Sequence, residues 1–142
     1  MRCALSIQIP LLAFVACSKS LPDGATGFSG TGCYECCFET STFVADPPTN
    51  SEFWWVEAPP RAFDEAFKKL RETHPTTDRS FSVSVRVQGW IGPPGQYGHM
   101  GGATRLLVIH DFSEMRPRPG GCPIITPPEF LEPLPNSEGS SQ

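Results

Sequence analysis

Prolines and glycines are frequent in this sequence and limit it to short secondary-structure elements. The 142 residues include 16 prolines and 13 glycines. Proline lacks a backbone donor and glycine favours turns, so a bundle of long helices is disfavoured. Ten phenylalanines and three tryptophans still supply enough apolar surface for one small core. The sequence therefore predicts one domain of short elements joined by turns.

The N-terminal sequence has the features of a secretory signal. A single charged residue, Arg2, precedes the uncharged apolar segment 4–16, which has 13 residues. A membrane-spanning helix needs about 20 residues, so this segment is too short to cross a bilayer. It matches the apolar region of a signal peptide, and residues 1–16 are predicted to be removed on export.

The end of this segment, LAFVAC, resembles the lipobox of bacterial lipoproteins, with Phe14 where leucine is usual. The resemblance implies that Cys17 is lipidated and that several acyl chains anchor the protein stably in a membrane. Ser18 follows instead of the aspartate that retains lipoproteins in the inner membrane, which indicates an outer-membrane anchor facing the periplasm. Two alternatives are a plain signal peptide cleaved near Ala16 and a cytosolic protein with a buried first strand.

Composition divides the rest of the chain into three parts. Residues 17–32 are rich in Ser, Gly and Thr and are predicted to form a flexible tether. Residues 116–142 are rich in proline, which cannot continue a sheet ladder, and are predicted to form an extended, partly disordered tail. Residues 33–115 are therefore expected to form the folded domain.

Alternation of apolar and polar residues predicts the strands of this domain. The segment 33–45 places Tyr34, Cys36 and Phe38 on one face, as in a half-buried strand. A second, short aromatic strand is expected within 51–58. The segment 79–92 alternates most regularly, and a further strand over 103–112 is apolar on both faces and is expected to lie centrally. The residues of 79–92 expected to face the core are Phe81, Val83, Val85 and Val87.

Over residues 60–74, between the second and third predicted strands, the apolar residues recur at the spacing of a helix instead of a strand. Pro60 suits the first turn of a helix. The predicted order β-β-α-β-β gives a mainly β fold: a small, curved antiparallel sheet that closes into a barrel and packs one α-helix. An open α+β sandwich is the alternative. The apolar stripe of the helix consists of Phe63, Ala66, Phe67 and Leu70.

The chain also resembles a family of uncharacterised bacterial envelope lipoproteins with small barrel-like domains. The matching pieces are CFETSTF followed by FWWV, and VRVQGWIGPPGQYGHMGG followed by LLVIHDF. They span roughly residues 36–112, and the loop GQYGHMGG is the most specific of them. The resemblance implies an OB-like barrel in the cell envelope. It implies no reaction, because unrelated functions share this barrel.

The loop 95–102 has two interpretations. Its glycines suit a wide turn in which Tyr97 covers one end of the barrel and His99 bonds to a backbone carbonyl. Alternatively, Tyr97 and His99 offer an aromatic face and a titratable group for binding. The structural interpretation is favoured, and the binding interpretation stays open.

Four cysteines remain beyond the signal peptide and the lipidation site. Exported proteins tend to pair their thiols. Cys36 and Cys37 are neighbours on opposite faces of a strand and should not pair with each other. A bridge from Cys33 or Cys37 to Cys122 would close a loop of about 85 to 90 residues and add about 4 kcal/mol of stability. Cys36 is expected to be a buried thiol, and redox or zinc chemistry of the CYECC segment is the alternative.

We expect a non-catalytic binding or structural module that engages an envelope protein or a glycan. Tyr97, His99 and one of Trp54 and Trp55 would form its surface, because successive strand residues face opposite sides. The sequence contains no GxSxG, HExxH or GxxxxGK motif, so no catalytic residue, metal or cofactor is predicted. The net charge of −4 without a basic stripe argues against nucleic acid.

A second hypothesis assigns the chain to another class. His99, His110 and Asp111 are the residues that a small exported enzyme or a metal-binding protein would use, since a hairpin could bring them close together. A catalytic zinc site requires three such ligands. The separation of His99 from His110 therefore discriminates between the two hypotheses.

Overall fold

The computed structural model describes residues 20–37, 40–48, 52–76 and 80–123, except the side chain of Cys37. The predictions made for Cys17, for the signal peptide 1–16 and for residues 124–142 lie outside this part of the chain. Among the described residues, no helix has the length and apolar character that crossing a membrane requires.

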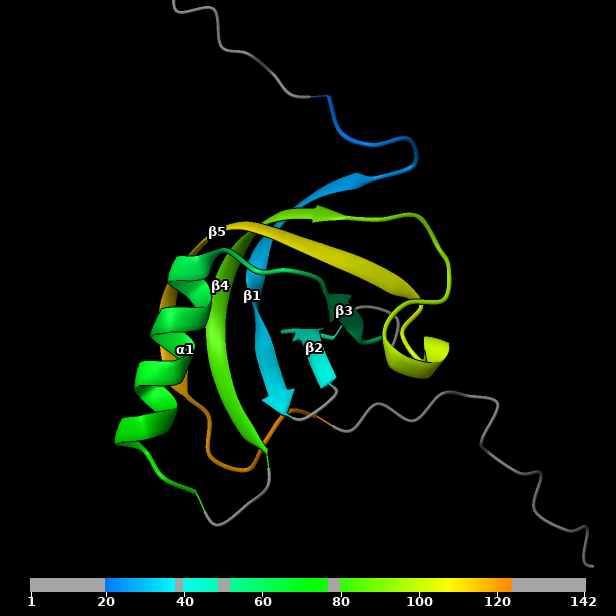
Figure 1. The fold of residues 1–142 in the computed structure, drawn as a ribbon. Helices are drawn as coiled ribbons and strands as arrows, with labels where there is room; N and C mark the ends of the chain where they lie inside the picture. Colours follow the sequence, from blue (N-terminus) through cyan, green and yellow to red (C-terminus); the bar gives the residue numbers. More distant parts are fainter. Residues whose placement is uncertain (1–19, 38–39, 49–51, 77–79, 124–142) are drawn as a thin grey trace, which may run out of the picture.

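Five strands close into a barrel in the order β1-β2-β3-β5-β4 (Figure 1). Neighbouring strands are antiparallel except β3 and β5, which are parallel. This is the predicted mainly β, OB-like barrel with one helix, and the barrel is closed rather than an open sandwich. The elements are β1 (Thr26–Cys37), β2 (Thr40–Ala45), β3 (Trp54–Val56), α1 (Arg61–Thr73), β4 (Phe81–Ile91), the short 3-10 helix η1 (His99–Gly101) and β5 (Arg105–Pro117).

Strand β1 begins well inside the segment 17–32 that was predicted to be a tether. It pairs with β4 from Thr26 onward. The glycines that suggested flexibility serve the curvature of the barrel, because a Cβ at Gly32 would overlap the ring of Phe43 and the carbonyl oxygen of Val44. A Cβ at Gly30 would lie 2.9 Å from the ring of Phe28. The predicted domain boundary at residue 33 was therefore placed too late.

The predicted strand 33–45 is in fact two strands that form a hairpin. β1 and β2 pair antiparallel from Gly32 opposite Ala45 to Cys37 opposite Thr40. The chain therefore reverses between Cys37 and Thr40. Alternation continues through the reversal, so periodicity alone could not locate it.

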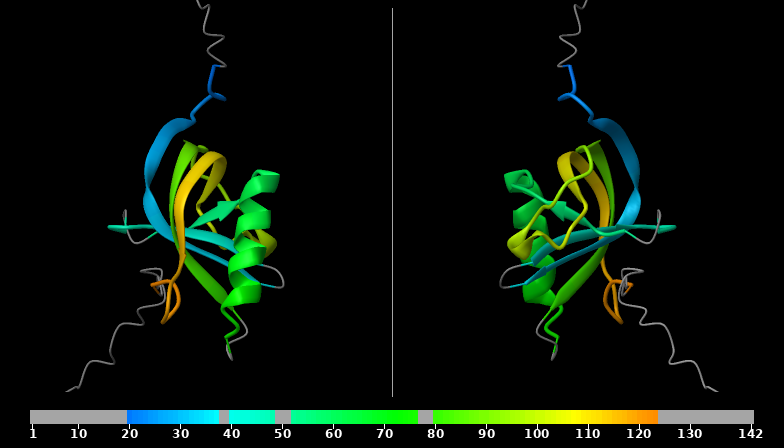
Figure 2. Two further views of the ribbon diagram at one scale, coloured as in Figure 1. Left: turned by 90° about the vertical axis from the view of Figure 1, so that its left-hand side faces the viewer. Right: turned by 90° about the vertical axis from the view of Figure 1, so that its right-hand side faces the viewer.

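The interior of the barrel follows the predicted pattern of β4, because Phe81, Val83, Val85 and Val87 are all buried. The helix adds its apolar stripe to this interior and lies along one side of the barrel in Figure 2. Phe63 meets Tyr34 of β1 and Phe112 of β5 edge-on, with ring centroids 5.0 and 5.1 Å apart. The other contacts of the stripe are Phe67 with Tyr34 and with Phe81.

Strand β5 lies between β3 and β4, but every strand of a closed barrel has two neighbours, so this position does not distinguish β5 as a central strand. Its two faces are not equally buried. Leu107 and Ile109 lie in the core, whereas Leu106 and Val108 are half-buried on the outer side. Only one face of a strand can line the interior of a barrel. The other face of β5 lies outside, although it also carries apolar residues.

A disulfide joins Cys33 of β1 to Cys122, with Cα atoms 5.5 Å apart and a sequence separation of 89. This is one of the two predicted bridges to Cys122. Cys36 is a free, half-buried cysteine that packs against the core. Because the disulfide and a hydrogen bond from the Arg118 N–H to the Ser82 carbonyl hold residues 118–122 on the barrel, the predicted tail boundary at residue 116 falls inside the fold.

Candidate functional site

The β4–β5 loop is a regular extension of the two strands that it joins. The N–H of Gly92 donates to the carbonyl of Leu106 at 2.8 Å, and the N–H of Gly95 donates to that of Thr104 at 3.0 Å. Tyr97 and Ala103 exchange both backbone hydrogen bonds, at 2.8 and 3.2 Å. The base of the loop is therefore held by a ladder in spite of its glycines.

Tyr97 closes this loop. Its hydroxyl donates a hydrogen bond of 2.9 Å to the carbonyl of Pro93. Its ring covers Gly95, where a Cβ would lie 2.9 Å from the ring. Both the face and the hydroxyl of Tyr97 are thus used inside the loop, which supports the structural interpretation of this residue.

The tip of the loop contains three residues with positive φ angles. They are Gly98 at 77°, Met100 at 65° and Gly101 at 67°. The left-handed region costs an L-residue about 1 to 2 kcal/mol, so Met100 is strained where the two glycines are not. The side chain of Met100 is also 92% exposed. His99 lies in η1 beside it, and its side chain is exposed.

The two tryptophans of β3 have different surroundings, as alternation along a strand predicts. Trp54 is 3% exposed and contacts the rings of Phe28 and Phe43, with centroids 5.0 and 5.9 Å away. Trp55 is half-buried on the other side of the strand. The core position of Trp54 leaves Trp55 as the tryptophan of β3 that is available for binding.

Trp55 and the tip of the loop are in contact. The six-membered ring of Trp55 lies where a Cβ of Gly98 would be, so only glycine fits at this position. Gly102 approaches the ring of Phe53, where a Cβ would lie 3.8 Å away. We call the residues Phe53, Trp55, Gly98, His99 and Met100 the loop surface. Sequence reasoning missed the half-buried Phe53 and the exposed Met100, because neither alternation nor motif spacing marks an apolar side chain that the fold does not fully bury.

The structure does not assemble the alternative cluster of His99, His110 and Asp111. Among the described residues, no three His, Cys, Asp or Glu side chains lie close enough together to hold a metal ion. The carboxylate of Asp111 accepts a hydrogen bond of 2.8 Å from the amide of Phe112. His110 and Asp111 instead line a hollow on the outer face of β1, β4 and β5.

The groups with shifted pKa values lie elsewhere. Burial raises the pKa of the Tyr34 phenol, and a hydrogen bond with Ser41 opposes this shift. Desolvation raises the pKa of the Asp64 carboxyl in α1. Both groups lie at the contact between the helix and the barrel, away from the loop surface, so the shifted pKa values do not mark a centre there.

Comparisons with protein-family models, with curated proteins and with solved structures gave no match.

Proposed function

We propose that this chain is a lipid-anchored protein of the cell envelope, without catalytic activity, whose barrel binds a protein partner in the periplasm through the loop surface. The lipid would be carried by Cys17 and the anchor would lie in the outer membrane. The proposal needs no cofactor and no metal.

The observation that carries the proposal is the conformation of Met100. Its backbone lies in the left-handed region with φ 65°, and its side chain is 92% exposed. Neither property stabilises the isolated protein, because the backbone is strained and an apolar side chain is left in water. Strain of this kind is found where binding uses it. Met100 therefore gains a favourable environment only when a partner covers it.

The chemistry of the loop surface favours a protein partner over a glycan. Phe53, Trp55 and Met100 present apolar groups, and the hydroxyl of Tyr97 is already bonded to Pro93. A sugar would require polar groups directed at its hydroxyls. A flexible, exposed methionine instead suits an apolar pocket or groove of another protein.

Two further features support an exported barrel. A disulfide such as Cys33–Cys122 persists in oxidising compartments and is rare in the cytosol. The net charge of −4 is unsuited to a polyanionic partner such as nucleic acid.

Site-specific photo-crosslinking in the producing cells tests the partner. A photoreactive phenylalanine analogue is placed at residue 100, and a matched control carries it at the exposed Glu72 of α1. We expect a discrete protein adduct from position 100 that position 72 does not give. The same adducts from both positions, or none from position 100, would contradict a partner at the loop surface.

Metabolic labelling with a clickable fatty acid tests the anchor separately. The wild-type chain should incorporate the label and fractionate with the outer membrane, and Cys17→Ser should do neither. Label retained by the Cys17→Ser variant would contradict lipidation at this residue.

A further inference from the structure

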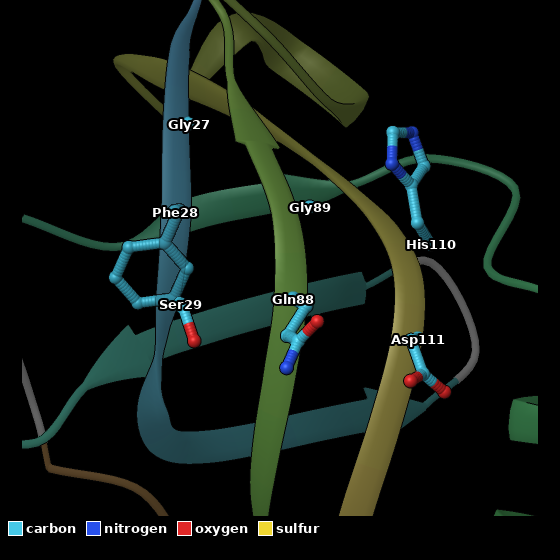
Figure 3. Close-up of a pocket in the computed structure, with 7 residues that line it drawn as sticks. All are labelled: Gly27, Phe28, Ser29, Gln88, Gly89, His110 and Asp111. Atoms are coloured by element: carbon cyan, nitrogen blue, oxygen red, sulfur yellow. The ribbon is translucent and has the colours of Figure 1, made fainter. Parts of the chain in front are cut away.

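A second surface, distinct from the loop surface, has the chemistry of a binding site. A hollow of about 470 Å³ lies on the outer face of β1, β4 and β5 (Figure 3). Its polar side chains are Ser29, Gln88, His110 and Asp111, and Gly27 and Gly89 contribute to its lining.

The register of the sheet explains why these side chains meet. Ser29 lies opposite Gln88, and Gln88 lies opposite Asp111, so one row crosses three strands. The register between β4 and β5 shifts after this row, since Gly89 pairs with Ile109. His110 is the extra residue of this bulge, which adds a second polar side chain to the β5 side of the hollow.

These groups keep most of their hydrogen-bonding capacity. Among the described residues, the one hydrogen bond recorded for the four side chains is that from the Phe112 amide to Oδ1 of Asp111. The hydroxyl of Ser29, the amide of Gln88 and Oδ2 of Asp111 therefore offer donors and acceptors within one row.

An aromatic residue adjoins the row. Trp90 follows Gln88 by two positions on the same face of β4, because the intervening Gly89 lies opposite Phe28, and Phe28 and Ile91 both pack against the core. Trp90 is half-buried and lies opposite Gly27. The space where a Cβ of Gly27 would be is open, with no atom within 4 Å. Trp90 is therefore next to the polar row on the outer face of β4, although it does not itself line the hollow.

We propose that this hollow binds a saccharide without acidic groups. The ring of a sugar would lie over Gly27 with its apolar face toward Trp90, and its hydroxyls would bond to Ser29, Gln88 and Asp111. The carboxylate of Asp111 and the absence of Lys and Arg from the lining disfavour phosphorylated or acidic ligands. This inference does not depend on the loop surface or on its protein partner.

Titration of the full-length 15N-labelled protein in detergent with cellotriose and with triacetylchitotriose tests the proposal. We expect saturable shifts of the Trp90 indole N–H and the Gln88 side-chain NH2, with a Kd of about 1 mM for at least one probe. Gln88→Ala and Asp111→Ala should each weaken binding about tenfold. Ser113→Ala, on the exposed face of β5 outside the hollow, is the matched control and should bind as the wild type does.

Three results would overturn the proposal. The first is no saturable shift with either trisaccharide, and the second is saturable shifts that leave Trp90 and Gln88 unaffected. The third is equal affinity in the wild type, Gln88→Ala and Asp111→Ala. Thermal unfolding of each variant, which should match the wild type because both side chains are exposed, separates loss of binding from loss of fold.

Discussion

Gly98 of the β4–β5 loop lies against the indole of Trp55 in β3, so closely that a side chain at residue 98 has no room. The contact joins the tip of a long loop to a short strand that precedes α1 in sequence. It also fixes where Met100 projects, because η1 starts directly after Gly98. The loop surface is therefore a packed structure, and its parts can be tested one residue at a time.

Gly98→Ala should destabilise the protein by more than about 2 kcal/mol. Residue 98 has φ 77° and ψ −177°, a region that glycine alone adopts readily, and its new methyl group would collide with Trp55. Chemical denaturation followed by tryptophan fluorescence measures the loss. Gly102→Ala is the control, because φ is −73° there and the added Cβ has ordinary contacts. Equal effects of the two substitutions would show that the Gly98–Trp55 contact has no special importance.

Met100→Gly should leave the free energy of unfolding unchanged or raise it by up to about 1 kcal/mol, because glycine relieves the strain at φ 65°. The same substitution should weaken capture of the partner identified by crosslinking, since the apolar side chain is gone. Thermal unfolding and a pull-down with that partner measure the two effects. A clear loss of stability would instead show that the side chain of Met100 supports the fold.

Cys122→Ala should lower the free energy of unfolding by about 4 kcal/mol, because the bridge to Cys33 closes a loop with a sequence separation of 89. A reductant should lower the stability of the wild type to nearly the same level. Urea denaturation with and without dithiothreitol measures both. The variant itself serves as the control, and an equally large effect of the reductant on Cys122→Ala would mean that other thiols are responsible.

Tyr34→Phe should abolish part of the alkaline destabilisation of the protein. The pKa of the buried Tyr34 is raised in the folded state, whereas in the unfolded chain it is about 10. Above that pH the unfolded state releases a proton that the folded state keeps, so stability falls by about 1.4 kcal/mol per pH unit. At neutral pH the variant should lose about 1 kcal/mol with the hydrogen bond to Ser41. Denaturation at pH 8 and pH 11 tests this, and parallel losses in both proteins would contradict it.

Periodicity revealed the elements whose side chains pack by regular alternation. The valines of β4, the stripe of α1 and the division between Trp54 and Trp55 were all predicted because burial in a barrel repeats every second residue and in a helix every third or fourth. The start of β1 was missed because Gly30 and Gly32 read as flexibility. Both positions require glycine because the rings of Phe28 and Phe43 occupy the space that a Cβ would need. No local sequence pattern reveals this requirement.

The candidate site was predictable in its location but not in its composition. Glycine spacing in GQYGHMGG marked the loop, and one of Trp54 and Trp55 was expected at its surface. Met100 was missed because its role depends on a backbone angle, and Phe53 because its position depends on where Gly102 comes to lie. The hollow near Trp90 depends on the pairing of three strands. The sequence of one strand does not determine the register that it takes with its neighbours in the closed sheet.

The early start of β1 has a consequence for where the barrel works. At about 3.5 Å per residue when fully extended, the chain from Cys17 to Thr26 can reach no farther than about 30 Å, roughly the thickness of a bilayer's hydrocarbon core. The segment preceding β1 and the one following β5 leave opposite ends of the barrel (Figure 1). With fatty acids on Cys17, the end near Gly24 and Pro93 would face the headgroups and the Cys122 end would point away from them. A barrel anchored in this way would sample only a thin layer next to the membrane, so its ligands would also have to lie beside the lipid.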